Sequence, residues 1–153
     1  MAKAKRTTKS IVNRRARYDY MIGDTLIVGL ELTGAETKAL RLGHGNLTGS
    51  YVSIKDNQLY LINATISGTG AIHIKDVEQT RTRKLLAKRR EINHLIETKH
   101  QGKTIIPLEI LTQGRFIKLK IATAQGKKRY DKRETLRQRS AKRQIETKLK
   151  SKR

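Results

Sequence analysis

The stretch DTLIVGLELTGAETKALRLG, residues 24–43, decides the fold of this chain. Its first nine residues alternate, with apolar side chains at the even positions from Leu26 to Leu32 and mixed side chains at the odd positions. Such a period of two is typical of a β-strand with one buried face. Gly29 inside this strand indicates a bulge or the close approach of another backbone.

The second half of the stretch predicts a short helix. Thr33 is followed three residues later by Glu36, which matches a capping box at a helix start. Gly43 or Gly45 would end the helix, because glycine adopts the left-handed conformation common after a last turn. A strand that leads directly into a helix therefore predicts mixed elements at the start of the chain.

Further elements follow by the same patterns. Residues 51–66 predict two strands around a Lys55-Asp56-Asn57 turn, and residues 67–80 predict a mobile loop. Residues 83–97 predict an amphipathic helix with one apolar stripe. The stripe consists of Leu85, Ile92, Leu95 and Ile96.

Two strands are expected near the end of the apolar part of the chain, at residues 103–111 and 115–124. Pro107 places the first of them at a sheet edge or a bulge. Five or six short strands with two helices favour a mainly β fold with short helices, a small closed antiparallel barrel of the OB type. A different small α+β sheet fits the pattern nearly as well.

The charge of the chain indicates a polyanionic partner. Lys and Arg number 35 against 13 Asp and Glu, a formal net charge of +22. Residues 1–17 hold seven basic and no acidic residues, and residues 127–153 hold 13 basic and three acidic residues. We therefore expect a nearly ordinary domain between two basic arms, with nucleic acid as the first candidate partner and an anionic membrane as the second.

Composition also excludes several classes of protein. The chain has no Cys, which excludes a disulfide framework and Cys-ligated zinc. No apolar run approaches a membrane span of about 18 residues, and the basic N-terminus lacks the apolar region of a signal peptide. We expect a soluble cytoplasmic protein that is a monomer when free and does not engage a membrane.

The usual enzyme motifs are weak. The four His residues fall at no metal-ligand spacing, and no phosphate-loop or nucleophile-elbow motif is present. The sequence therefore predicts neither an enzyme nor a metal or cofactor site.

Two groups of residues fit nucleic-acid binding. Lys38 and Arg41 are three apart on the expected helix and share a face. Phe116, Lys118 and Lys120 share one face of a strand, where a ring for base stacking lies beside phosphate-binding charges. Either group alone is equally consistent with a solvated surface.

Four motifs in order resemble the small protein B (SmpB) family, the SsrA-RNA-binding proteins of bacterial trans-translation. The motifs are NRRARYDY, GLELTGAETKALRLG, RTRKLLAKRREI and GKKRYDKRETLRQR, which span residues 13 to 139. The resemblance implies an OB-like barrel that binds the tRNA-like domain of transfer-messenger RNA (tmRNA) and delivers it to stalled 70S ribosomes. The tail would reach the empty decoding centre and mRNA path of the small subunit.

The resemblance also implies site residues, matched position by position. The tmRNA-binding residues are Asn13, Arg15, Tyr20, Glu36, Lys38 and Arg41. The ribosome-engaging residues are Lys127, Lys128, Tyr130, Asp131, Lys132 and Arg133.

The expected domains are a flexible arm at 1–12, an RNA-binding barrel at 13–125 and a basic tail at 126–153. The chain departs from the family pattern at Ile27, where an acidic residue is common, and at Thr37, Ala39 and Ala87.

The tail is expected to be disordered in the free protein and helical on its partner. Its like charges repel and it has little apolar surface to bury. Asp131 followed by Glu134 resembles a capping box, and Ala141, Ile145 and Leu149 form a narrow apolar stripe. A polyanionic RNA channel would cancel the repulsion and order the helix.

Two rival functions remain open from the residues alone. One is a ribosomal or assembly protein that anchors its arms in rRNA, and the other is a basic OB-type enzyme or nuclease. Sequencing the RNA that copurifies with the protein separates them from the tmRNA hypothesis, since one dominant structured RNA would favour the latter.

Overall fold

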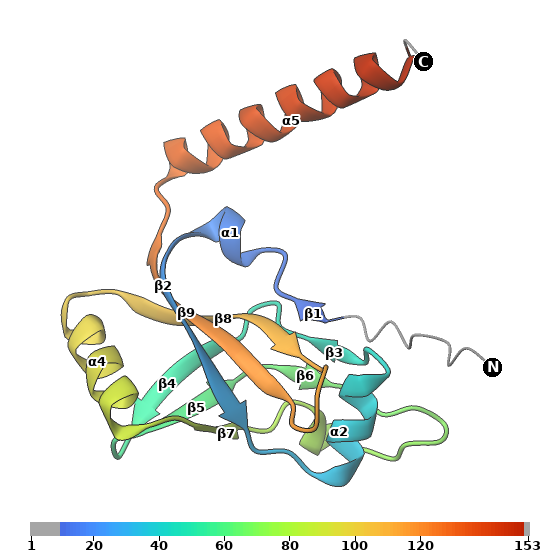
Figure 1. Ribbon diagram of the computed structural model, residues 1–153, viewed down its shortest axis with the longest axis vertical. Helices are drawn as coiled ribbons and strands as arrows, with labels where there is room; N and C mark the ends of the chain where they lie inside the picture. Colours follow the sequence, from blue (N-terminus) through green and yellow to red (C-terminus); the bar gives the residue numbers. More distant parts are fainter. Residues whose placement is uncertain (1–9, 152–153) are drawn as a thin grey trace.

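The computed structural model describes residues 10–151, and within them lie nine strands and five helices. In chain order they are β1 (Ile11–Val12), α1 (Ala16–Asp19), β2 (Tyr20–Leu30), α2 (Gly34–Arg41), β3 (Gly45–Asn46), β4 (Tyr51–Lys55), β5 (Gln58–Ile62), β6 (Thr65–Ile66), α3 (Asp76–Gln79), β7 (Arg83–Leu86), α4 (Arg89–His100), β8 (Thr104–Leu111), β9 (Lys118–Gly126) and α5 (Arg129–Ser151). Helices and strands hold similar numbers of residues, so the fold is mixed α and β (Figure 1).

The expectation of a closed barrel is wrong, because the main sheet is open. Seven antiparallel strands pair in the order β1-β8-β9-β2-β7-β5-β4, and β3 pairs separately with β6. The edge strand β1 has two residues and, among the strands of residues 10–151, pairs with β8 alone. The other edge strand, β4, packs near β8 without a strand ladder between them. The sheet therefore curls but does not close.

The alternation expected in the opening stretch is confirmed in β2, which pairs with β9 on one side and β7 on the other. Val28 and Leu30 are buried in the core, whereas Ile27 is 52% exposed on the opposite face. The close approach expected at Gly29 is also present, since a Cβ there would lie 3.1 Å from Cβ of Leu86. The β2 bulge lies elsewhere, between Ile22 and Thr25.

The helix expected at 83–97 is wrong over its first residues. Arg83–Leu86 forms strand β7 between β2 and β5, and the helix α4 begins only at Arg89. Leu85 thus belongs to the sheet core and not to the helix stripe. The four-residue alternation of β7 is too short to outweigh the helical pattern that follows it, so only pairing with two neighbouring strands reveals it.

The remaining local expectations have mixed outcomes. The hairpin of β4 and β5 is confirmed, with Asp56 and Asn57 at the positive φ angles that its tight turn requires. Pro107 lies next to a bulge in the pairing of β8 with β9, as expected. The expected loop at 67–80 contains the short helix α3.

The tail forms one helix, α5, none of whose residues is buried. This is the helical conformation that the sequence predicts for the tail on its partner, and the disorder expected in the free protein stays a prediction. Asp131 is not the cap: it lies in the first turn and its carboxylate accepts a hydrogen bond from N of Lys128 at 3.3 Å. The start of the chain, including most of the expected arm at 1–12, lies outside the described residues, although Ile11–Val12 forms β1.

The capping box expected at α2 is present, and its acid has two further partners. Thr33 Oγ1 accepts from N of Glu36, and the Glu36 carboxylate accepts from N of Thr33. The same carboxylate accepts from Nε and Nη2 of Arg81, at 2.8 and 2.6 Å, and from Nε of Arg83 at 3.0 Å. Glu36 is 1% and Arg83 0% exposed, so this ion cluster joins α2 to β7 inside the core.

Charge pairing decides the ionisation of the cluster. Burial alone would raise the pKa of Glu36, but the hydrogen bonds from Arg81 and Thr33 and the charge of Arg83 together lower its pKa below the usual value of 4.5. Burial lowers the pKa of Arg83 against the opposing effect of Glu36, and an arginine remains charged at all ordinary pH values. The other nitrogens of Arg83 donate to carbonyl oxygens, among them Ala64 at 2.8 Å.

We expect Glu36→Gln to destabilise the fold by about 3 kcal/mol or more at pH 7, because it leaves buried Arg83 without a counter-charge. Gln keeps an oxygen that accepts the capping-box hydrogen bond. The loss of folding stability in this variant therefore reports the ionic contacts and not the helix cap. The ionised form stabilises the fold above the usual pKa of Glu36, 4.5, and this contribution is lost as the pH falls through the lowered folded pKa. Urea unfolding at several pH values measures both effects.

The difference in stability between parent and variant should therefore narrow below pH 4.5. Glu97→Gln is the matched control, because Glu97 is an exposed carboxylate on α4. Surface substitutions usually change the free energy of unfolding by less than about 0.5 kcal/mol. A difference that small between the parent and Glu36→Gln at pH 7 would show that the cluster contributes little to stability.

Candidate nucleic-acid interface

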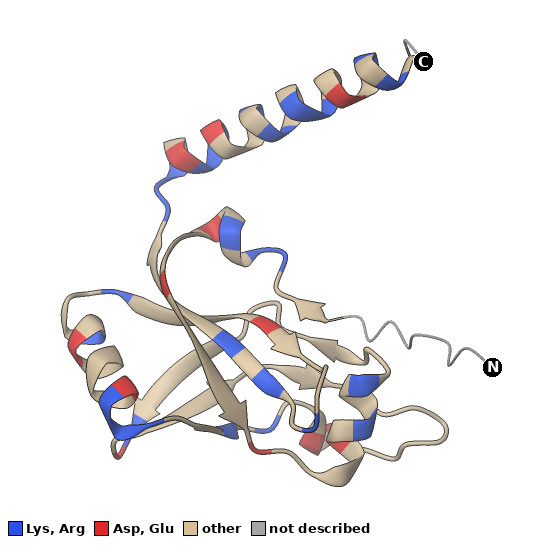
Figure 2. Cartoon of the chain, in the orientation of Figure 1, with Lys and Arg blue, Asp and Glu red and all other residues tan. Residues whose placement is uncertain are grey.

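Basic side chains lie on several parts of the described surface. Figure 2 shows Lys and Arg along α5, on β9 and on α2, and also around α1 and on α4, with some Asp and Glu among them. Helix α5 alone holds nine basic and three acidic residues. A surface of this kind attracts phosphates, and exposed rings beside such charges can in addition stack on bases.

One face of the sheet carries apolar side chains exposed among lysines. We call it the outer sheet face, and it consists of Ile27, Gly29, Leu86, Lys118 and Lys120, together with Phe116 in the loop directly before β9. Gly29 is paired with Lys118 on one side and Leu86 on the other, and Ile27 is paired with Lys120. Ile27, Leu86 and Phe116 are 52%, 54% and 68% exposed. An exposed ring and aliphatic surface beside lysines suit base stacking combined with phosphate contact.

The sequence revealed only part of this face. The alternation indicated Lys118 and Lys120 on one strand face, and the burial of Leu119 between them confirms this. Phe116 was expected on the same strand, but it lies in the loop before β9, which begins at Lys118. Leu86 was missed because it was assigned to a helix. The alternation places Ile27 on the outer side of its strand, as the structure shows, but only the pairing of Ile27 with Lys120 joins it to the lysines.

Three of the expected RNA-binding residues lie together at a second place. Asn13, Arg15 and Tyr20 line a cavity of about 440 Å³ between α1 and β4. Asn13 is buried and donates from Nδ2 to O of Pro107 at 3.0 Å, which holds the segment before α1 against β8. Its Oδ1 is buried and has no hydrogen-bond partner among residues 10–151. Arg15 is exposed and pairs with Asp19 at 3.6 Å.

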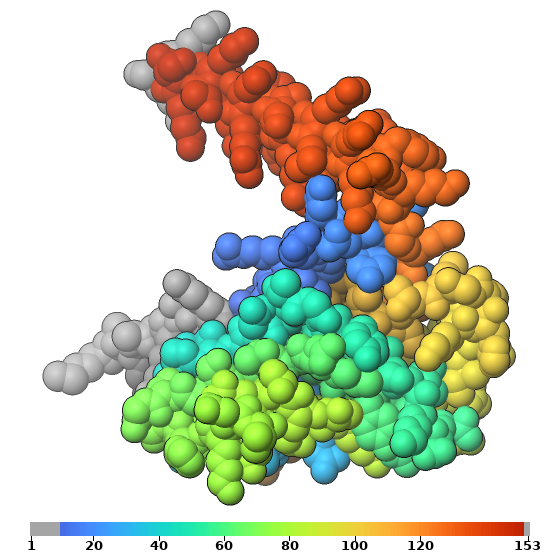
Figure 3. All heavy atoms as spheres, turned by 180° about the vertical axis from the view of Figure 1, so that it is seen from behind, coloured from blue at the N-terminus to red at the C-terminus, as the bar shows by residue number. Residues whose placement is uncertain are grey.

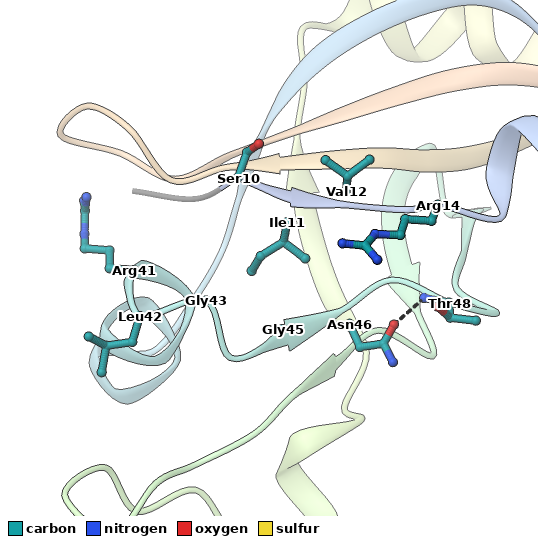
Figure 4. A pocket seen from close by; sticks show the side chains of 10 residues that line it. All are labelled: Ser10, Ile11, Val12, Arg14, Arg41, Leu42, Gly43, Gly45, Asn46 and Thr48. Atoms are coloured by element: carbon teal, nitrogen blue, oxygen red, sulfur yellow. Dashed lines mark hydrogen bonds between the residues drawn. The ribbon is translucent and has the colours of Figure 1, made fainter. Parts of the chain in front are cut away.

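A larger groove of about 710 Å³ runs between β1, β3 and the end of α2 (Figure 4). The expected residue Arg41 lies at its rim, but its guanidinium is already engaged. Nη1 donates to O of Thr112 and of Gly114, and Nη2 donates to O of Arg115, at 3.0 to 3.1 Å. Arg41 therefore holds the loop that leads into β9. Arg14, which the sequence did not single out, is exposed and lines the same groove.

The other two expected residues of α2 have different positions. Glu36 is inside the core cluster, where both carboxylate oxygens are occupied by Arg81, Arg83 and Thr33. Lys38 is exposed on the solvent side of α2. Of the two departures nearby, Ala39 is fully buried and Thr37 bonds back to O of Thr33 at 2.9 Å. Lys38 is thus the residue of α2 whose charge is free to meet a phosphate.

The tail motif occupies the end of β9 and the first turns of α5. Tyr130 is 65% exposed, and Lys128 and Arg133 are exposed beside it. Lys127 and Lys132 instead contact α1, where Lys132 Nζ lies 3.3 Å from Asp19 Oδ1. Asp131 bonds the backbone of Lys128. The exposed half of the motif can therefore meet a partner without any rearrangement of the helix.

Further along α5, Ile145 and Leu149 are 60% and 64% exposed, so the apolar stripe of the tail has no cover within the described chain. In residues 10–151, no three His, Asp or Glu side chains lie close enough together to hold a metal ion. No described helix combines the length and apolar character needed to cross a membrane.

Comparison with known proteins identifies the family of this chain. The family model of the SmpB protein matches residues 10–151. The chain is 44% identical to the SsrA-binding protein of Shouchella clausii over 139 residues, which cover 90% of this chain and 89% of that one. The SsrA-binding proteins of Halalkalibacterium halodurans and Roseiflexus sp. are 43% and 44% identical, over 92% and 90% of this chain and 92% and 89% of theirs.

A solved structure described as "tmRNA-SmpB: a journey to the center of the bacterial ribosome" superposes with a TM-score of 0.67 and 36% sequence identity. The match covers 84% of this chain and 94% of that chain. The motifs quoted from the sequence, the exposed basic surface and the fold thus agree with one another. This chain belongs to the SmpB protein family, whose members are RNA-binding proteins and not enzymes.

Proposed function

We propose that this protein binds the tRNA-like domain of tmRNA and delivers it to stalled 70S ribosomes for trans-translation. In this proposal the tail probes the empty decoding centre and the mRNA channel, and the protein acts as a cytoplasmic monomer. The relatives are named SsrA-binding proteins, and the similar solved structure concerns tmRNA and SmpB in the bacterial ribosome.

One observation carries the proposal, namely the division of the chain into a packed body and a projecting basic helix. The body, with its core and its outer sheet face, ends with β9 at Gly126. The helix α5 then leads away from the sheet with no buried residue (Figure 1). Its 23 residues span about 34 Å at about 1.5 Å per residue, which is long enough to enter a channel that the body cannot enter.

On the body, the RNA-facing residues divide by what their side chains do. Lys38 and the lysines of the outer sheet face are available to phosphates, and Phe116 and Tyr20 supply rings. Glu36 and Arg41 act through other residues, since the first anchors α2 and the second holds the loop before β9. Asn13 is buried and holds the segment that carries Arg15, so it too acts through another residue.

In the tail, we assign the first contact with the ribosome to Lys128, Tyr130 and Arg133. Tyr130 can stack on an exposed base while the neighbouring charges meet phosphates. Lys127, Asp131 and Lys132 hold the start of α5 in the free protein and join the contact once the helix is in place.

We expect Lys38→Ala to weaken tmRNA binding and to flatten its salt dependence. One lost phosphate contact reduces the slope of log K against log salt by about 0.7 to 0.9. Filter binding to the isolated RNA at several salt concentrations measures this slope. Lys55→Ala, at the exposed end of β4, is the matched control and should leave the slope unchanged.

An unchanged slope for Lys38→Ala would remove this residue from the interface. Arg41→Ala is a poor test of the same idea, because it frees the carbonyls of Thr112, Gly114 and Arg115. We expect that variant to lower stability before it alters RNA contacts.

Binding and ribosome rescue should be separable. Truncation after Gly126 keeps β9 complete and removes no buried residue of the tail, so affinity for isolated tmRNA should fall only by the loss of nonspecific attraction. Peptide tagging on ribosomes stalled at a message end should be abolished. In the full chain, Tyr130→Ala with Arg133→Ala should impair tagging much more than RNA binding.

Tag addition in a reconstituted translation system, paired with filter binding, measures the two activities. Circular dichroism of the truncated protein serves as the control for an intact body. A truncation that reduced binding and tagging in equal proportion would make the tail part of the RNA clamp and would contradict the proposed division.

A further inference from the structure

The loop between β8 and β9, at residues 112–117, presents an aromatic ring to solvent. Both ends of the loop are anchored, because Thr112 and Ile117 are buried. The four residues between them are exposed, and Phe116 is the ring among them. Gly114 has a φ angle of +89°, a conformation that favours glycine, and it turns the chain at the tip of the loop. The loop thus has a fixed base and an open tip.

Arg41 is the side chain that holds this loop. Within the described chain, no hydrogen bond between two backbone groups involves the loop residues. Instead, Nη1 of Arg41 donates to O of Thr112 and to O of Gly114, at 3.0 and 3.1 Å. Its Nη2 donates to O of Arg115 at 3.0 Å. Figure 4 shows Arg41 pointing away from the groove, towards this loop. A planar guanidinium meets several carbonyls at once, whereas a lysine ammonium cannot fork in this way.

The ring of Phe116 is held from both of its chain neighbours. Cζ of Arg115 lies 5.4 Å from the centre of the ring, which is within the range of a cation–π contact. The carbonyl of Arg115 is the one that Nη2 of Arg41 binds, so the backbone directly before the ring is fixed. The backbone directly after it is fixed by buried Ile117. The ring is therefore held in place although most of its surface is exposed.

The loop lies on the side of the body that carries the outer sheet face. Phe116 stands two residues before Lys118, where β9 begins. Figure 1 shows the loop next to β9 and close to α2, whereas the view from behind in Figure 3 is filled by the segment from β3 to β7, in teal to green. One RNA strand on this side can therefore place phosphates against the lysines and a base against the ring.

We propose that Phe116 is a stacking platform for one unpaired base of the bound RNA, and that Arg41 is the positioning residue that holds this platform. The proposal rests on the proposed function, because it names one contact between the body and tmRNA. The base stacks on the open face of the ring, opposite Arg115, whose charge then attracts a neighbouring phosphate. A base within a duplex is covered by its neighbours, so the platform takes a base from a loop or a bulge.

Arg41 acts through the loop in this scheme and does not contact RNA. Its guanidinium already donates three hydrogen bonds within the protein. A ring that is held in place loses less conformational entropy on binding than a ring on a free loop, and this difference adds to the affinity. The affinity for RNA therefore depends on Arg41 only while Phe116 is present.

The first experiment detects stacking on the ring. The chain has no Trp, so Phe116→Trp introduces a single indole fluorophore into the full-length protein. We expect tmRNA to quench this fluorescence, because a base stacks directly on the indole. Val77→Trp, at an exposed position of α3, is the control and should keep its intensity. Equal quenching in the two proteins, or no quenching in Phe116→Trp, would overturn the platform.

The second experiment is a double-mutant cycle in filter binding to tmRNA. Phe116→Ala should weaken binding about tenfold, which corresponds to about 1.4 kcal/mol and lies in the range of one stack between a base and an aromatic ring. Arg41→Lys keeps the charge but loses the fork, and should weaken binding about fivefold. The double variant should bind within about twofold of Phe116→Ala, because the two residues act as one unit.

Two outcomes of the cycle would contradict the proposal. Parent-like binding by Arg41→Lys would show that only the charge of Arg41 matters, as in a direct phosphate contact. Losses that multiply in the double variant would show that Arg41 acts independently of the ring. Circular dichroism and urea unfolding establish that each variant is folded under the conditions of the binding assay.

A change within the loop tests the same idea without altering Arg41, and it decides the matter should Arg41→Lys fail to fold. Gly114→Val forces a β-branched residue into a φ angle of +89°, and no atom lies within 4 Å of its Cβ, so backbone strain is what disturbs the loop. Its loss of tmRNA affinity should vanish when Phe116→Ala is already present. An equal loss in both backgrounds would overturn the proposal.

Gly102→Val is the matched control, because Gly102 has a φ angle of +83° with equally open surroundings, in the turn after α4. It should bind tmRNA like the parent. Equal losses of affinity in the two glycine variants would reflect general destabilisation and would contradict a specific role of the loop.

The platform and the proposed function can fail separately. Parent-like tmRNA binding by Phe116→Ala would remove the platform and leave the proposed function in place. A parent that does not bind tmRNA would instead contradict the proposed function. Single-stranded RNA added to Phe116→Trp would then decide the platform, since quenching supports it and unchanged fluorescence overturns it.

Discussion

The buried ion cluster of Glu36 with Arg81 and Arg83 is the contact on which the rest of the body depends. It caps α2, joins that helix to β7 and satisfies a guanidinium that is fully buried in a chain of net charge +22. Such a cluster adds little net stability compared with apolar packing, but removing one partner leaves an uncompensated charge in the core. It therefore specifies where α2 lies, and with it the positions of Lys38 and Arg41.

The same strand that carries Arg83 inward carries Leu86 outward. Alternation along β7 thus links the ion cluster in the core to the outer sheet face, because both depend on one register between β7 and β2. Gly29 lets Leu86 approach the backbone of β2. Lys120 has the apolar Ile27 as its neighbour on β2 and the acidic Glu109 as its neighbour on β8. The surface proposed for RNA is therefore a product of sheet pairing and not of any one motif.

Charge repulsion separates the tail from the body. A helix with nine basic residues and a thin apolar stripe gains little by packing on a body that is itself basic, so it projects into solvent. Its first turns are an exception, because Asp19 and Tyr18 offer one acidic group and one ring where β9 ends. The body and the tail can then act on different parts of a large RNA assembly.

The sequence by itself determined the local elements and the family. The alternation of β2, the capping box of Thr33 and Glu36, the tight turn after β4 and the ordered basic motifs each depend on residues a few positions apart. Only the tertiary structure decided that 83–86 is a strand, that the sheet stays open, that Glu36 pairs with arginines 45 and 47 residues away, and that Arg41 holds a distant loop. Periodicity records which face of an element is buried, whereas the partner that buries it is chosen by packing between segments far apart in the chain.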